Sequence, residues 1–237
     1  MRRGLDVTPV AGARVALTDA QTGSAGTETD AEGRITLQHV IPGRLDLSVW
    51  HKDLCAASVQ VDVAPGADLD LGDVIMLPGV AVELALDDFG GKGSVRFNCL
   101  DALPAGRMPH DSCVSNESHK TYPLRLFPGR YGMLASGPRG VALVEIDVHA
   151  APAAPIHFDL RPGATLRIDN RVGAGFARLE VASASGVIVR RRELSGTGVE
   201  LVSLPPGDYV ATITDAVGAV TRRTIHLTSD GAVLAIP

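Results

Sequence analysis

The sequence predicts an all-β protein made of three tandem, antiparallel β-sandwich units of the Greek-key type. Apolar and polar residues alternate with a period of two in short stretches along the chain, each bounded by Gly, Pro, Asp or Ser. No stretch of the sequence keeps the spacing of an amphipathic helix. Short strands at intervals of about 8 to 12 residues are typical of a sandwich or barrel, and one pattern of strand, Pro-Gly and strand occurs three times.

The alternating stretches give the expected strands in chain order. In the stretch 44–49, Leu45, Leu47 and Val49 alternate with polar residues, so one face of the strand is expected to be buried. The chain contains 26 Gly and 15 Pro among 237 residues, which interrupt it too often for long helices. The other expected strands are 14–18, 34–37, 59–63, 121–126, 165–168, 198–201 and 221–227.

A repeated Pro-Gly turn indicates the number of units. Proline fixes φ at about −65°, and glycine accepts the positive φ that a tight reversal demands. Two positions after the glycine, Leu45, Tyr131 and Tyr209 each start the next strand facing inward. We expect the two tyrosine rings to be buried and their hydroxyls to bond to the backbone across the corner, which is a structural role. The matching stretches are 37–49 (LQHVIPGRLDLSV), 124–135 (LRLFPGRYGMLA) and 201–213 (LVSLPPGDYVATI).

The ends of the units are also alike. Each ends in a turn of acidic or small residues followed by an apolar stretch that we expect to form a strand, within 64–77, 150–160 and 228–236. A further Pro-Gly follows the first two of these, at Pro78-Gly79 and Pro162-Gly163. Such short junctions predict a rod-like or gently bent array. The expected units are 1–78, 79–162 with a long loop at 99–121, and 163–237.

The first unit carries a combination of motifs that resembles a known family. The segment 9–15 reads PVAGARV, the hairpin 29–34 reads TDAEGR, Pro42-Gly43 forms the turn, and 71–73 reads LGD. Together these resemble the carboxypeptidase regulatory-like domain, a transthyretin-like (prealbumin-like) or immunoglobulin-like β-sandwich found in tandem in many bacterial surface and secreted proteins. The second and third units keep only the Pro-Gly turn and the closing segment.

The resemblance implies a non-enzymatic role. Members of the family act as structural spacers, stabilising modules or binding modules attached to something else, so we expect an adhesion-like or supporting region of a larger bacterial polypeptide. The expected compartment is extracytoplasmic, meaning the periplasm, the envelope or secretion. Only the residues MRRGLDVT precede the first motif, so we expect the first strand of the family to be shortened.

Charge and hydropathy exclude several other classes. The net charge of −5 does not favour phosphate backbones, so no nucleic-acid partner is expected. Apolar runs are far shorter than the roughly 20 residues of a membrane-spanning helix, and the opening residues lack the apolar region of a secretory signal. We expect no cofactor. The expected partner is an unidentified protein or glycan.

The loop from Cys99 holds the residues best suited to chemistry. A disulfide between Cys99 and Cys113 would close a loop of about 15 residues and stabilise the unit by about 3 kcal/mol. Alternatively, Cys99, His110, Cys113 and His119 are ligand types that suit a tetrahedral zinc ion, and such a site would make the loop a metal-binding or catalytic element. The spacing lacks a tight Cys-x-x-Cys pair, and reduced, unbonded thiols are the third alternative. The loop could also recognise a protein.

Other candidate residues have simpler interpretations. No Gly-x-Ser-x-Gly, His-Glu-x-x-His or paired-carboxylate motif occurs in the sequence, so no catalytic residue is expected. Trp50 follows an inward position and is expected to face outward, as a contact with the neighbouring unit or as a stacking surface for a glycan. Cys55 is expected to be a small buried apolar residue. The arginines at 190–192 are expected to protect the edge of a strand against aggregation.

Overall fold

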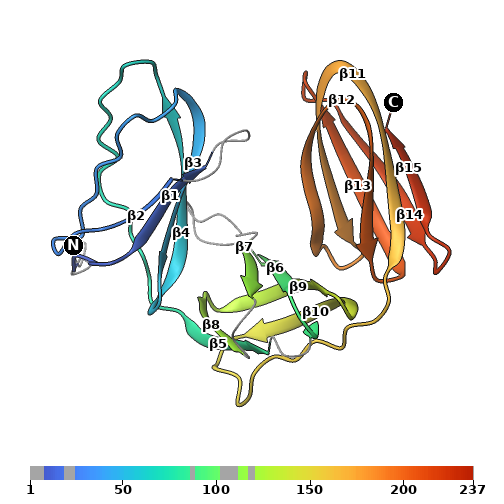
Figure 1. Cartoon of the computed structure of the whole chain (residues 1–237), viewed down its shortest axis with the longest axis horizontal. Helices are drawn as coiled ribbons and strands as arrows, with labels where there is room; N and C mark the ends of the chain where they lie inside the picture. Colours follow the sequence, from blue (N-terminus) through green and yellow to red (C-terminus); the bar gives the residue numbers. More distant parts are fainter. Residues whose placement is uncertain (1–7, 19–24, 86–88, 102–111, 117–120, 237) are drawn as a thin grey trace.

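The computed structural model describes residues 8–18, 25–85, 89–101, 112–116 and 121–236. Within these ranges the regular structure consists of strands β1 to β15, and no α-helix is present. The all-β class predicted from the alternating pattern is therefore confirmed. The strands form three groups, which we call the N-terminal group (β1 to β4), the middle group (β5 to β10) and the C-terminal group (β11 to β15) (Figure 1).

The N-terminal group is one antiparallel sheet with the order β2-β1-β3-β4. Its strands are β1 (Arg14–Thr18), β2 (Ala25–Glu28), β3 (Gly43–His51) and β4 (Leu54–Val63). The inward positions Val15, Leu47, Val49 and Val61 form its buried core. Segments without ladder pairing cover this core, and they contribute Ile35, Leu37, Val74 and Met76.

The middle group has two sheets around one core. Strands β5 (Val80–Ala85) and β8 (Thr121–Leu126) pair with each other, and β6 (Gly93–Cys99), β7 (Ser112–Asn116), β9 (Gly129–Gly137) and β10 (Gly140–Val148) form a sheet with the order β10-β9-β6-β7. The rings of Phe89 and Phe158 meet edge to face in the core, with their centroids 5.8 Å apart. Residues of β5, β6 and β9 belong to this one buried cluster, so the two sheets pack face to face.

The C-terminal group is built on two long strands, β11 (Ala164–Ser183) and β12 (Ile188–Leu204). They pair with each other from Ala164 to Ala182, with register shifts between Asn170 and Phe176 and between Val181 and Ala182. The first half of β11 also pairs in parallel with β15 (Ala232–Ile236), and its second half pairs with β13 (Gly207–Asp215), which in turn pairs with β14 (Val220–Leu227). Both halves share one buried cluster, so the long strands fold over to form both layers.

The Pro-Gly turns have the predicted geometry in all three groups. The glycines Gly43, Gly129 and Gly207 have φ values of 142°, 153° and 156°, a region that L-residues rarely adopt. Two positions later, Leu45, Tyr131 and Tyr209 are 5%, 4% and 2% exposed. The Tyr209 hydroxyl donates to the carbonyl of Pro205 at 2.6 Å. The corner predicted for this tyrosine is therefore confirmed.

Three of the expected strands are absent from the ladders. The stretch 34–37 makes no strand pairing, although Ile35 and Leu37 pack against the core as the alternation predicts. The closing segments 64–77 and 150–160 are likewise not strands, and in the second only Ile156 forms an isolated bridge, to Leu84. The alternation of apolar and polar residues predicts which side chains are buried. An extended segment can bury the same side chains without pairing with a neighbouring strand. In the C-terminal group the closing segment is a strand, β15.

The two junctions between the groups are tightly packed. A Cβ on Gly79 would lie 2.1 Å from the Cys55 sulfur and 2.7 Å from the Leu126 carbonyl oxygen, and so would clash with both the N-terminal and the middle group. A Cβ on Gly163 would lie 2.7 Å from a methyl group of Val141 and 2.3 Å from the Ser203 hydroxyl, on the other pair of groups. Figure 1 shows that the groups form a U with the middle group at its base, which is bent more sharply than the rod-like or gently bent array expected from the sequence.

The middle and C-terminal groups also share a buried contact. Val187, which is 0% exposed, packs against Gly132 of β9. Leu134 of β9 belongs to the buried cluster of the C-terminal group. The buried Asn98 side chain accepts a hydrogen bond from the backbone N–H of Ile188 at 3.1 Å. Strand β9 is therefore covered on both faces.

Candidate functional site

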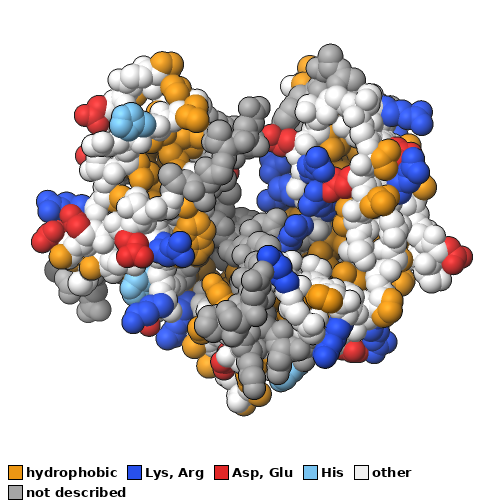
Figure 2. Space-filling model, in the orientation of Figure 1, with side chains coloured by type: hydrophobic (Ala, Val, Ile, Leu, Met, Phe, Trp, Pro, Cys, Tyr) orange, Lys and Arg blue, Asp and Glu red, His pale blue; other side chains and the backbone are white. Residues whose placement is uncertain are grey.

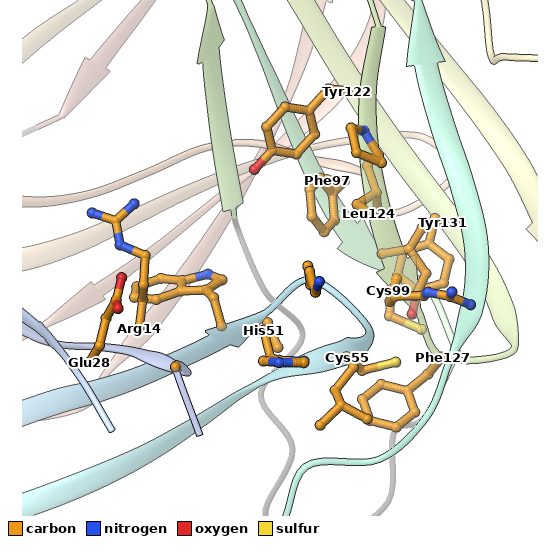
Figure 3. Close-up of a pocket in the computed structure, with 18 of the residues that line it drawn as sticks. Arg14, Glu28, His51, Cys55, Phe97, Cys99, Tyr122, Leu124, Phe127 and Tyr131 are labelled. Atoms are coloured by element: carbon orange, nitrogen blue, oxygen red, sulfur yellow. The ribbon is translucent and has the colours of Figure 1, made fainter. Parts of the chain in front are cut away.

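A cavity of about 620 Å³ lies between the N-terminal and middle groups. One wall is the turn that joins β3 to β4, including Trp50, His51 and Lys52, and the other is formed by β8 with parts of β6 and β9 (Figure 3). This volume is within the range of roughly 300 to 1,000 Å³ that is typical of ligand sites. The two walls are far apart in the sequence and meet only because the groups pack at the Gly79 junction.

Aromatic side chains are concentrated in this cavity. The chain has nine aromatic residues, namely one Trp, three Tyr and five Phe. Five of them line the cavity: Trp50, Phe97, Tyr122, Phe127 and Tyr131. Trp50 and Tyr122 are 39% and 38% exposed, whereas Phe97 and Tyr131 are 9% and 4% exposed. The cavity therefore has a buried aromatic floor and two rings that stay open to solvent.

The charges in the cavity are predominantly positive. Arg14, Lys52 and Arg125 line it, and Glu28 is the carboxylate among its lining residues. Arg125 donates to the carbonyl of Gly79 at 3.2 Å, which ties this cation to the junction. Among the ion pairs of the described part of the chain, none involves these three cations. The surplus contrasts with the net charge of −5 of the chain.

The floor of the cavity contains two thiols beside a phenol. Cys55 and Cys99 are buried and neither is in a disulfide, and Figure 3 shows both near Tyr131. Burial raises the pKa of the Tyr131 hydroxyl well above its usual range, and the neighbouring Cys99 thiol contributes to the same effect. The phenol is therefore neutral at physiological pH. The expectation that Cys55 is a small buried residue is confirmed, since it is 1% exposed.

The cavity runs along the edge of β8 that has no strand partner among the described residues. Six consecutive residues, 122–127, line it, and side chains of a strand alternate between its two faces. A cavity that touches every residue must therefore lie along the edge of the strand. Pro123 occupies this edge and has no backbone N–H to donate. A peptide added to this edge could not form a continuous ladder.

The predicted disulfide between Cys99 and Cys113 stays a prediction, because the side chain of Cys113 lies outside the described part of the chain. Cys99 is free, and the backbone of Cys113 pairs opposite Arg96 on β6, three residues along the strand from Cys99. Three residues of strand span about 10 Å, which exceeds the Cα separation of about 7 Å that a disulfide tolerates. The bond between Cys99 and Cys113 stays a prediction that would require the register of β6 and β7 to shift.

The alternative zinc site stays a prediction as well. It adds His110 and His119 to the two cysteines, and both histidines lie outside the described residues. Within the ranges that the structure describes, no group of three or more His, Cys, Asp or Glu is arranged to hold a metal ion. Native mass spectrometry of protein purified without added metal, before and after a chelator, tests this site directly.

Two other predicted surfaces can be placed. Trp50 is partly exposed at the cavity between the groups. This position is compatible with both predicted roles, a contact between units and a stacking surface for a glycan. Strand β12 lies at the edge of its sheet, as the interpretation of the arginines requires. Arg190 and Arg192 both pair with Glu200, and Arg191 pairs with Glu180 at 2.9 Å. Figure 2 shows Lys and Arg gathered on the C-terminal group along the gap of the U.

Comparisons with known proteins place this chain in no family. No family model and no curated protein matches it, so the resemblance of the first unit to the carboxypeptidase regulatory-like domain stays a prediction. Two solved structures are similar at 12% identity: the TIE protein of Bacillus anthracis (TM-score 0.26, 96% of this chain and 47% of that chain) and BcpA, the major pilin subunit of Bacillus cereus (TM-score 0.22, 98% and 95%).

The chain spans about half the length of the TIE protein. Neither likeness has a TM-score high enough to support an inference about function. In the described part of the chain, no helix has the length and apolar character to span a membrane.

Proposed function

We propose that this chain is a non-enzymatic array of three β-sandwich modules that acts as a structural spacer, a stabilising region or a binding region of a bacterial envelope or secreted protein. The modules correspond to 1–78, 79–162 and 163–237. The packing at the junctions carries this proposal, because Gly79 and Gly163 are each enclosed by residues of both neighbouring groups. The larger polypeptide and the extracytoplasmic compartment follow from the family resemblance of the first unit.

The core organisation supports the same proposal. Three buried clusters form, each centred on one group of strands, as expected for modules that each have a core of their own, and Leu134 of β9 joins the cluster of the C-terminal group. Flexible linkers would let such modules move independently, whereas a linker enclosed on both sides fixes their orientation. An array with fixed orientation is suited to hold a surface or a partner at a set distance.

Small-angle X-ray scattering of the full chain tests the proposal. We expect the wild-type profile to match a U-shaped particle. In Gly163→Val the new side chain has no space between Val141 and Ser203, so the last two groups should separate and the radius of gyration should rise. Gly198→Val is the matched control, because nothing lies within 4 Å of a Cβ at that glycine. An elongated wild-type particle, or an unchanged profile for Gly163→Val, would contradict a fixed array.

A further inference from the structure

We propose that the cavity between the N-terminal and middle groups binds an acidic saccharide, meaning a short run of sugar rings that carry carboxylates. This inference rests on the proposed function, because the cavity exists only while the first two modules pack at Gly79. Three properties of the cavity carry it: the exposed aromatic rings, the surplus of cations, and an edge along which a peptide could not form a continuous ladder.

The exposed rings provide stacking surfaces. Trp50 comes from the N-terminal group and Tyr122 from the middle group, and each keeps about two-fifths of its surface open. They are the aromatic members of the set of exposed large apolar residues in the described chain, and both line this cavity. The C–H face of a sugar ring is apolar and carries partial positive charge, so it packs well on the negative face of an aromatic ring.

The cations select for negative charge on the ligand. Arg14, Lys52 and Arg125 line the cavity, and Glu28, which lies opposite Arg14 on the neighbouring strand, is the carboxylate among the lining residues, so the lining has a net positive charge in a chain whose net charge is −5. Arginine binds carboxylates through directed, charge-assisted hydrogen bonds. Glu28, the carboxylate of the lining, lies beside Arg14, whereas Lys52 and Arg125 form no ion pair within the described residues and so keep this capacity for a ligand. A neutral saccharide would use the rings and leave the charge uncompensated.

The edge of β8 argues against a peptide ligand. Peptides that bind along a sheet edge gain affinity from a continuous set of main-chain hydrogen bonds. Residues 122–127 all line the cavity, and Pro123 among them has no N–H, so it would interrupt the main-chain hydrogen bonds of a bound peptide. The ligand is then held by side chains, which are mainly aromatic and cationic here. This combination fits an acidic saccharide.

The sole tryptophan of the chain gives the test a direct signal. Trp50 lies in the cavity and no other Trp is present, so trigalacturonic acid titrated into the full chain should change the tryptophan fluorescence. We expect the affinity to fall with added salt, because exposed charges are screened. Maltotriose, which has no carboxylate, should bind at least about tenfold more weakly. No binding of trigalacturonic acid, or equal binding of maltotriose, would overturn the proposal.

Variants measured by calorimetry locate the ligand. Trp50→Ala and Tyr122→Ala should each weaken binding by about tenfold, and Arg14→Gln with Lys52→Gln should bring the acidic ligand close to the neutral one. These side chains are partly or largely exposed, so the fold should persist. Arg167→Gln is the matched control, since Arg167 is an exposed cation of the C-terminal group. Equal affinity in the cavity variants and the control would place binding elsewhere and refute the site.

A junction variant separates this proposal from the module array. Gly79→Val should force the first two groups apart at Cys55 and Leu126, and so abolish binding while the cores stay folded. If scattering shows docked modules in the wild type but trigalacturonic acid does not bind, the saccharide proposal fails and the array stands. If the wild-type modules are not docked, the array itself fails.

Discussion

Tyr209 closes the corner between β12 and β13. Its ring is 2% exposed and its hydroxyl donates to the Pro205 carbonyl, four residues earlier in the chain. Tyr131 is placed in the same way relative to its Pro-Gly turn, and its hydroxyl meets Cys99 and the backbone of Phe127, again four residues earlier. The repeated turn thus places a phenol over the end of the preceding strand in two of the three groups.

Removing the Tyr209 hydroxyl should lower the free energy of unfolding. Tyr209→Phe keeps the buried ring but leaves the Pro205 carbonyl without its 2.6 Å partner, so we expect a loss of about 1 kcal/mol. Urea unfolding at neutral pH measures it. Tyr122→Phe serves as the control, because Tyr122 is 38% exposed and its change should have little effect. Equal effects of the two variants would show that the corner bond does not stabilise the fold.

The Tyr209 hydroxyl should make the free energy of unfolding fall as the pH rises above 10. Burial raises the pKa of Tyr209 to about 12 from 10.0, so between these values the folded protein keeps a proton that the unfolded chain has lost. The contribution is complete below pH 10 and disappears as the pH rises through 12. Tyr209→Phe should therefore lose stability less steeply than the wild type over this interval, as measured by urea unfolding at a series of pH values. Parallel profiles would contradict the assignment.

Some of the site residues could be predicted from sequence and others could not. Trp50 was identifiable because strand alternation places it next to the inward Val49. Tyr122 and Phe127 were not, because their role depends on a wall contributed by a hairpin about 70 residues earlier. The signal available in the sequence was the scarcity of aromatics, but only the fold shows that five of the nine meet.

A five-residue turn recurs at the level of elements. Asp30 accepts from the backbone N–H groups of residues two and four positions later, at 3.0 and 2.7 Å, and the fourth residue of the turn is a glycine with positive φ. Asp215 does the same at 3.0 and 2.8 Å. Ser183 accepts from Val187 at 3.1 Å in a third copy. The sequence predicted the turn at 30–33, but the other two lack its flanking charges.

The carboxylate of Asp215 should stabilise the hairpin between β13 and β14. In Asp215→Ala two backbone donors lose their acceptor, although exposure lets water replace it in part, so we expect a loss of about 1 kcal/mol. Gly218→Ala should cost a similar amount, because Gly218 has a φ of 84° that alanine adopts with strain. Thermal unfolding compares both with Gly198→Ala, whose added methyl group meets nothing. Unchanged stability in Asp215→Ala would show that the turn forms without its side chain.

The element boundaries also show what strand alternation cannot supply. Ile35 and Leu37 are oriented as predicted, yet their segment has no ladder partner. A strand needs a neighbour at hydrogen-bonding distance, and the neighbour is set by topology. In the C-terminal group the closing segment finds such a neighbour in the first half of β11, and there the predicted strand is formed.

The U shape of the whole molecule depends on glycines at the contacts between the groups, where the absence of a side chain lets the neighbouring group pack closely. A Cβ on Gly132 would lie 2.2 Å from a methyl group of Val187, so β9 approaches the C-terminal group only because position 132 has no side chain. The Pro-Gly junctions were visible in the sequence, whereas Gly132 lies inside a strand and gave no sign of an interface. The U is more sharply bent than the rod-like or gently bent array expected from short junctions, because the groups pack on each other as well as being linked.

A double-mutant cycle tests whether Gly132 and Val187 form one unit of the interface. Gly132→Ala introduces a methyl group where Val187 has its own and should cost about 1 to 3 kcal/mol, and Val187→Ala should cost about 2 kcal/mol through lost burial. In the double variant, the smaller side chain at position 187 makes room for the methyl group added at position 132. The loss of unfolding free energy in the double variant should therefore be smaller than the sum of the two single losses by about 0.5 kcal/mol or more. Urea unfolding of the four proteins measures this coupling. Strict additivity would mean that the two positions do not touch in solution, and the U would then need another origin.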